Sequence, residues 1–315
     1  MRFLITSNIK NNPPLRVLVI LFLIGSLLYW IAGWFFYHYK FGLTYEKMFL
    51  YFFADPSFPE LLPPAQLLED IHIQLFMTIV FLTVLTPVFL HGSRSGRPAK
   101  LLLPAVFLGG AGEAIASAGV YLLGPSLIYL KILLFILFQV GAGFMILSSL
   151  RVYLTGGRET APERSLLYAV VLFFALSTIL FTLVSFFLFA LKLGLTPESV
   201  SEYYRGNPHK FIKPKSLSLL LEAITPHLLA MSLYVFALVH LAFFTNLRRR
   251  ILWSLLLFSC ALTENLSTLL IRFLWEGFSY LKIASFLGLC AGMLYLSVVL
   301  IVSLLRHRAG EPVVL

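Results

Sequence analysis

The sequence contains few charged residues. Asp, Glu, Lys and Arg make up 12% of its 315 residues, while hydrophobic residues make up 59%. A soluble domain carries roughly 25% charged residues, so the composition excludes an ordinary soluble protein. The mean hydropathy of +0.91 agrees with this, and we therefore interpret the chain as an integral membrane protein.

Cysteine is also scarce. The two cysteines, Cys260 and Cys290, lie within long apolar runs, where a thiol behaves as a small hydrophobic group. There is no C-x-x-C-H run, which excludes covalently attached c-type haem, and no cysteine cluster for an iron–sulfur centre. The sequence also lacks a nucleotide-binding loop, a metalloprotease helix and a nucleophile–base spacing. We therefore expect no enzymatic activity of its own.

The chain nevertheless has a net charge of +10. A nucleic-acid-binding protein would gather its basic residues on one face, whereas here they sit at the ends of apolar runs. Most fall on one side of the membrane if the N-terminus is cytoplasmic, so the positive-inside rule predicts cytoplasmic N- and C-termini. Lys210, Lys213 and Lys215 oppose this from a long external loop. We expect a bacterial inner-membrane location, with the lipid bilayer as partner and no nucleic acid.

Eight apolar runs are long enough to cross a bilayer as helices, which takes about 20 residues. They are continuous and do not alternate like β-barrel strands, so the predicted fold is an all-α integral membrane protein. The first run is too long for a signal peptide and lacks a small-residue cleavage site, so we expect a retained anchor. The predicted spans are Leu15–Tyr39, Ile71–His91, Leu101–Leu123, Leu127–Leu150, Ser165–Leu191, Ser218–Thr245, Ile251–Trp275 and Tyr280–Leu305.

The two halves of the chain repeat each other. The stretch FGLTYEKMFLYFFADP from Phe41 resembles LGLTPESVSEYYRGNP from Leu193, and further matches keep an offset of 151 to 153 residues. Four spans per half give both halves the same orientation, so we predict two parallel four-helix repeats, residues 1–157 and 158–315. Matching pairs include Lys40 and Lys192, Tyr51 and Tyr203, Glu113 and Glu264, Lys131 and Lys282, and Phe135 and Phe286.

Each half also carries features that predict local packing. The aromatic runs Phe49–Phe53 and Tyr203–Tyr204 follow the first span of each half and are typical of short segments at the membrane interface. Small residues let helices approach closely, which predicts tight packing of the third and fourth spans of the first half. These small residues are Gly109, Gly110, Gly112, Gly141 and Gly143.

Two motifs of the second half carry a resemblance. GLTPESVSEYYRGNP and LLEAITPHLLAMSLYVFALVH resemble a group of small, poorly characterised bacterial four-helix membrane proteins. Those proteins typically have a G-x-T-P loop and then a His-x-His pair that opens a transmembrane helix. The resemblance implies that the chain is two such units fused. The chain departs from the pattern, with His72 and Gln74 in one half and Thr225 and His227 in the other.

Two glutamates and two lysines fall within predicted spans at equivalent positions. Glu113 and Glu264 are followed in the next span by Lys131 and Lys282. An intramembrane charge costs about 2.5–3.5 kcal/mol on insertion scales, so these groups need partners. One interpretation is an ion pair inside each helical hairpin. The other is a proton or cation site, as in transporters that bind near the midplane of a repeat.

Three histidines are candidate cofactor ligands. His227 and His240 lie thirteen positions apart on one predicted helix, and the first half has Gln74 and Pro87 at the matching places. A cytochrome with two haems is therefore disfavoured. A single haem b could take His72 and His227 as axial ligands to its iron. Alternatively, His72 is interfacial and His227 bonds a neighbouring helix.

These observations leave three hypotheses for function. The first is a polytopic bacterial membrane subunit that binds haem b or quinone and transfers electrons beside other membrane or periplasmic subunits. The second is a proton- or cation-coupled transporter that uses Glu113 and Glu264. Transporters usually break a helix near the midplane, whereas Pro226 and Pro87 lie toward the ends of their predicted helices, which weakens this hypothesis. The third is an accessory subunit that is purely structural.

Overall fold

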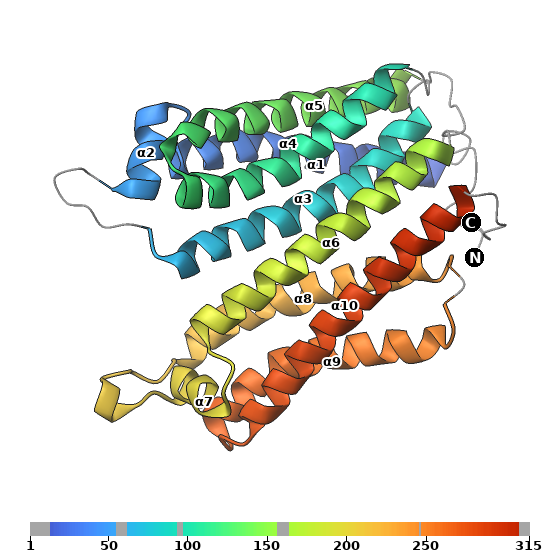
Figure 1. Ribbon diagram of the computed structural model, residues 1–315. Coiled ribbons are helices and arrows are strands. Elements are labelled where there is room, and N and C mark those ends of the chain that lie inside the picture. Colours follow the sequence, from blue (N-terminus) through green and yellow to red (C-terminus); the bar gives the residue numbers. More distant parts are fainter. Residues whose placement is uncertain (1–12, 55–61, 93–96, 156–163, 246, 309–315) are drawn as a thin grey trace. The chain divides into compact units, whose positions relative to one another are not determined.

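The computed structural model describes residues 13–54, 62–92, 97–155, 164–245 and 247–308, and these are helical almost throughout (Figure 1). Within these residues, eight helices are long and apolar enough to cross a membrane, which confirms the predicted fold class. They are α1 (Pro13–Lys40), α3 (Pro64–Gly92), α4 (Arg97–Leu123), α5 (Ile128–Thr155), α6 (Arg164–Lys192), α8 (Leu217–Ala242), α9 (Arg250–Phe273) and α10 (Phe278–Arg308). Shorter elements are α2 (Tyr45–Phe53), α7 (Pro197–Arg205), η1 (Pro125–Leu127) and η2 (Pro208–Lys210).

The spanning helices satisfy their backbone groups internally, as hydrocarbon requires. Each span has 24 to 31 residues, and at 1.5 Å per residue even the shortest exceeds a hydrocarbon core of about 30 Å. Prolines lie inside three of these helices, Pro87 in α3, Pro104 in α4 and Pro226 in α8. The sequence-based count of helix-interior prolines overlooked Pro104, which falls in the first turns of α4.

The chain divides into two compact units, Met1–Phe174 and Ala175–Leu315. The division falls inside α6, because Leu166, Val170 and Phe173 at the start of this helix belong to the core of unit 1. The ring of Phe173 stacks on Phe107 of α4 with centroids 4.1 Å apart. The predicted boundary between residues 157 and 158 lies outside the described residues and stays a prediction.

Within unit 1, α1, α3, α4 and α5 run alongside one another (Figure 1). Helices α4 and α5 form a hairpin whose turn contains Gly124, at φ 110°, and η1. That backbone angle is one that a side chain would strain. Within unit 2, α8, α9 and α10 pack together, and α7 lies across α9 and α10.

Each unit contains a stacked pair of aromatic rings at an equivalent place. These pairs extend the sequence repeat to the first helix of each half. Tyr37 of α1 stacks on Phe135 of α5 with ring centroids 3.5 Å apart. Phe189 of α6 stacks on Phe286 of α10 at 4.0 Å, and both pairs have an interplanar angle of 11°. A stacked pair of rings therefore joins the helix that opens each half to the helix that closes it.

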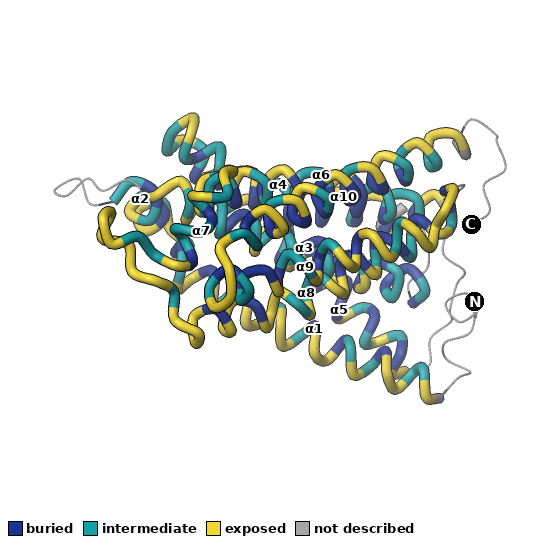
Figure 2. Tube along the Cα trace, turned by 90° about the horizontal axis from the view of Figure 1, so that it is seen from below, coloured by how far each residue is buried: buried dark blue, intermediate teal, exposed yellow. Residues whose placement is uncertain are grey.

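Large apolar side chains cover the outer faces of the helices. Figure 2 shows exposed residues along most of α1. Leu28 and Phe35 are two of the large apolar residues that are exposed on this helix. Leu101 on α4 and Leu133 on α5 are also exposed. A monomeric soluble protein rarely exposes apolar patches of this extent, whereas lipid tails solvate such faces. In unit 2, Phe236 and Ile251 are exposed as well, so the exposed side chains support the bilayer as the surroundings of both units.

The repeated Gly-Leu-Thr motif forms the junction between a spanning helix and a short helix, α2 or α7, which we predict to lie at the membrane interface and call the interfacial helix. Gly42 and Gly194 have φ angles of 78° and 80°, a left-handed conformation that glycine adopts without strain and that commonly ends a helix. Two residues later Thr44 and Thr196 cap α2 and α7 through their side-chain oxygens. The motif therefore stops one helix and starts the next within four residues.

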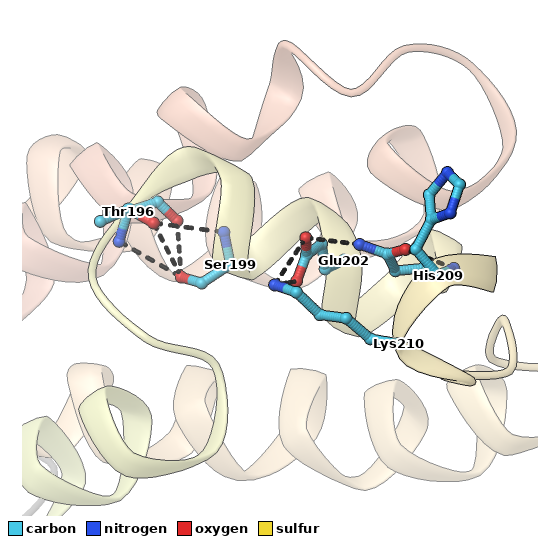
Figure 3. Close-up of polar contacts among 6 residues, drawn as sticks. Thr196, Ser199, Glu202, His209 and Lys210 are labelled. Carbon is cyan, nitrogen blue, oxygen red and sulfur yellow. Dashed lines mark hydrogen bonds and ion pairs between the residues drawn. The ribbon is translucent and has the colours of Figure 1, made fainter.

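A compact turn follows α7 (Figure 3). Asn207 and Ile212 exchange two backbone hydrogen bonds of 2.9 and 3.0 Å. The Glu202 carboxylate accepts hydrogen bonds from Asn207 Nδ2 at 2.7 Å and from Lys210 Nζ at 2.7 and 3.0 Å. The Lys210 ammonium and the Asn207 amide hold the pKa of Glu202 below its usual range.

Gly109→Ala is expected to destabilise unit 1. A Cβ atom at Gly109 would lie 2.7 Å from the Phe138 backbone nitrogen and 3.0 Å from the Leu134 carbonyl oxygen of α5, so the two helices would have to separate. Overpacking of this kind costs about 1–3 kcal/mol, which thermal unfolding in detergent micelles would register as a lower midpoint. Gly25→Ala is the control, since its Cβ would meet nothing within 4 Å. Equal midpoints for the two variants would contradict the close approach.

Candidate functional site

In unit 1 a buried lysine meets a glutamate between α4 and α5. Lys131 of α5 is 0% exposed and forms an ion pair with Glu113 of α4, which is 7% exposed. Lys131 Nζ also donates to Ser117 Oγ at 2.8 Å. Glu113 and Ser117 are one helical turn apart and face the same side of α4, so this helix presents two oxygen acceptors to a single ammonium group.

Unit 2 repeats this arrangement between α9 and α10. Lys282 Nζ donates to Glu264 Oε1 at 2.6 Å, to the Glu264 backbone carbonyl at 2.9 Å and to Thr268 Oγ1 at 3.0 Å. The hydroxyl partner again stands one turn after the glutamate. We call the two sets, Glu113–Ser117–Lys131 and Glu264–Thr268–Lys282, the Glu–Lys pairs. The contact that sequence spacing predicted is present in both, while a proton or cation role stays a prediction.

Aromatic rings close both Glu–Lys pairs on the side of the interfacial helices. Lys131 Nζ lies 4.7 Å from the ring centroid of Phe41, four residues before α2, and 5.5 Å from that of Tyr37. Lys282 Nζ lies 5.5 Å from the ring of Tyr204, within α7. A cation over a ring face is attracted by the ring quadrupole. Each lysine thus binds its own hairpin and also the chain segment at the membrane interface.

Unit 1 has a second charged cluster at the interface. Asp70 of α3, 7% exposed, forms an ion pair with Lys40 at the end of α1 and accepts a hydrogen bond from the Tyr51 hydroxyl of α2. Burial, and then the hydrogen bond to Asp70, raise the pKa of Tyr51. The ring of Phe41 lies 5.3 Å from Lys40 Nζ as well as 4.7 Å from Lys131 Nζ, so it contacts both charged clusters.

Sequence reasoning missed Asp70. The repeat alignment places Glu69 opposite Glu222 and therefore Asp70 opposite Ala223, so comparison of the halves could not single it out. The available signal was rarity, because the sequence has one other aspartate, Asp55. Asp70 also stands in the second turn of α3, where a charge is close to the interface.

The three histidines lie on two helices, one in each unit. His72 is on α3 of unit 1, and His227 and His240 are on α8 of unit 2. His227 is exposed and its Nδ1 lies 2.8 Å from the Ala223 carbonyl. His240 is half-buried, with its ring stacked on Phe236 at 5.8 Å. Ligation of haem by His72 and His227, and a cofactor role for His240, stay predictions.

The described residues include no group of three or more His, Cys, Asp and Glu side chains that could hold a metal ion. A groove of about 230 Å³ lies between α8 and α9. Its lining is uncharged and includes Met231 and Phe258. Neither Glu–Lys pair lines this groove.

Two stretches of the chain, residues 42–160 and 194–311, match the family Aq_1264_TM, a transmembrane helical domain. Together they cover more than half of the sequence. The chain belongs to this family. No curated protein and no solved structure matches the chain.

The two matches define the family domain within this chain. They begin at Gly42 and Gly194, the glycines that end α1 and α6. Each copy of the domain therefore contains an interfacial helix and three spanning helices, while α1 and α6 precede the matched residues. The tandem match confirms the predicted duplication of a membrane domain. The multi-pass membrane location follows from it and from the eight apolar helices.

Breaking one member of a Glu–Lys pair is expected to destabilise the protein more than replacing both. Lys131→Met leaves the buried Glu113 carboxylate without its counter-ion, and removal of one partner from a buried pair costs about 3–5 kcal/mol. The double variant Glu113→Leu with Lys131→Met leaves no unpaired charge and should recover most of this loss. Thermal unfolding in detergent would measure both. Lys47→Met, at an exposed lysine of α2, is the control. A double variant as unstable as the single one would contradict the pairing.

Proposed function

We propose that the chain is a non-catalytic membrane subunit whose two locked hairpins hold the interfacial helices α2 and α7 in position for a partner. One observation carries the proposal: in both repeats the buried lysine contacts an aromatic ring of the interfacial segment, Phe41 or Tyr204, while it pairs with a glutamate of its own hairpin. The lysine ammonium group therefore sets the register of the two hairpin helices, and it also sets the position of the interfacial helix beside them.

The filled hydrogen-bonding capacity of Lys282 supports this role over transport. Lys282 has three oxygen partners for its three N–H groups. A site that binds a solute or exchanges a proton needs a path from water, and the groove between α8 and α9 has an uncharged lining. Coupled transport through Glu113 and Glu264 is the weaker alternative.

Replacement of both charges tests the proposed function. The variant Glu113→Leu, Lys131→Met is expected to fold but to lose its native assembly in solubilised membranes, measured by blue native electrophoresis, because the charged contact that sets the register and the lysine that contacts Phe41 are both gone. Retained assembly would contradict the proposal. Transport would not survive this change either. The companion measurement is proton or cation flux into liposomes that contain the purified protein, with a pH-sensitive dye. Flux that is present in the wild type and lost in Glu113→Gln or Glu264→Gln would overturn the subunit proposal in favour of transport.

Electron transfer with haem b is the second candidate, and the geometry of His227 favours it. A carbonyl oxygen only accepts, so His227 Nδ1 donates to Ala223 and Nε2 keeps its lone pair. Histidines that ligate a metal commonly donate their other ring nitrogen to a backbone carbonyl in this way. His72 and His227 are the residues predicted to hold the haem, which would supply a one-electron carrier; a quinone is the alternative cofactor.

A reduced-minus-oxidised visible spectrum tests the haem hypothesis. If it holds, the purified protein should show a b-type band, and both His72→Ala and His227→Ala should abolish it. His240→Ala tests whether His240 contributes. His209→Ala is the matched control, because this exposed histidine is in the loop after α7 and its loss should leave the band unchanged. A flat spectrum from protein purified under haem-sufficient conditions would exclude this candidate.

A further inference from the structure

The segment Arg205–Lys215, which we call the basic loop, is a charged surface that the proposed function does not use. It carries five basic side chains and no acidic one: Arg205, His209, Lys210, Lys213 and Lys215. Lys210 is paired with Glu202, the Arg205 guanidinium donates to the Ile271 carbonyl at 3.1 Å, and Lys215 Nζ lies 4.6 Å from the Tyr203 ring. Lys213 is exposed.

The loop is structured, and it holds an aromatic side chain away from the protein. The Asn207–Ile212 bridge closes the turn, and the Glu202 contacts brace it (Figure 3). At its tip Phe211 is 94% exposed and has a φ of 56°, a left-handed conformation that is uncommon for a bulky residue. Apolar surroundings would solvate such a ring better than water does.

The basic loop lies near the ends of the spanning helices, where the lipid bilayer can provide such surroundings. Helix α7 packs on α9 and α10 at the end where the turn between these two helices lies (Figure 1). Trp275 and Tyr280 in and beside that turn are 65% and 66% exposed. Aromatic residues of this kind gather at the headgroup level of a bilayer. The basic loop and Phe211 are therefore at the membrane interface.

The basic character belongs to one repeat. The equivalent segment of the first repeat, residues 53–63, has no Lys or Arg and includes Asp55 and Glu60. The orientation signal does not explain the charge either, because the basic loop lies at the opposite helix ends from the basic segments that carry that signal. A charge that neither the duplication nor the topology requires points to a ligand of opposite sign.

We propose that the basic loop binds the phosphate headgroup of an anionic phospholipid in the adjacent leaflet. Lys213, an exposed lysine of the loop, supplies the positive charge. Phe211 inserts between the acyl chains next to the bound headgroup. Clusters of Lys and Arg at the membrane surface recognise anionic lipids by this combination of charge and insertion. The inference does not rest on the proposed subunit role.

Native mass spectrometry of the detergent-solubilised protein with added lipid tests this inference. The wild type should retain phosphatidylglycerol in preference to phosphatidylcholine. Lys213→Gln should weaken that preference about fivefold, the factor for about 1 kcal/mol per basic residue near an anionic surface. Lys213→Glu, which changes the charge by two, should weaken the preference by about 25-fold relative to the wild type. Phe211→Ser should lower retention of both lipids.

Two controls separate the lipid from other sources of binding. Lys47→Gln, on the interfacial helix of the first repeat, removes an exposed lysine elsewhere and should leave retention unchanged. Glycerol phosphate should compete poorly with the intact lipid, because it lacks the chains that Phe211 contacts. The proposal would be overturned if the wild type showed no preference for phosphatidylglycerol, or if Lys47→Gln lost as much of that preference as Lys213→Gln. It would also be overturned if an acidic protein bound the basic loop and the loop showed no lipid preference.

Discussion

The structure depends on how a lysine is kept inside an apolar helical hairpin. A charge in hydrocarbon is costly, and Lys131 and Lys282 are almost fully buried. In both repeats the glutamate partner stands 18 residues earlier and the hydroxyl partner 14 residues earlier. These equal separations mean that the chain between the glutamate and the lysine, which includes the turn, has the same length in the two hairpins. The burial of one ammonium group thus fixes where each hairpin can turn.

The repeats agree in their interior and differ at the interface. Both contain the Glu–Lys pair, the stacked aromatic rings between first and last helix, and the Gly-Leu-Thr junction. Unit 1 alone has Asp70 with Lys40 and Tyr51, and unit 2 alone has the basic loop. Interior groups have few alternatives because an unpaired charge is penalised there, whereas interfacial groups can change with their ligands. The two domains therefore differ in the groups that they present next to their short helices.

The sequence was sufficient for features that follow from length and spacing. Apolar runs predicted the eight spans, and the constant offset predicted the duplicated domain and the contact of each glutamate with its lysine. It was not sufficient where the end of one helix meets the side of another. Asp70 contacts residues of α1 and α2 that are 30 and 19 positions away, and no periodicity connects them. The start of α6 likewise packs with unit 1, because Phe173 stacks on Phe107 there. An alignment of the two repeats gives no sign of this contact.

The Glu–Lys pairs are better explained by register than by stability. An apolar pair of similar volume often stabilises a protein as well as a buried ion pair does, so stability alone would not select charges at this depth. Apolar helices in lipid, however, associate without a hydrophobic driving force between them, so side-chain packing alone would set their register. One charged contact on each hairpin adds a second constraint, since any slip would leave both charges unpaired. The pair also determines the height at which Phe41 and Tyr204 meet the lysine, and hence the position of α2 and α7 relative to the membrane surface.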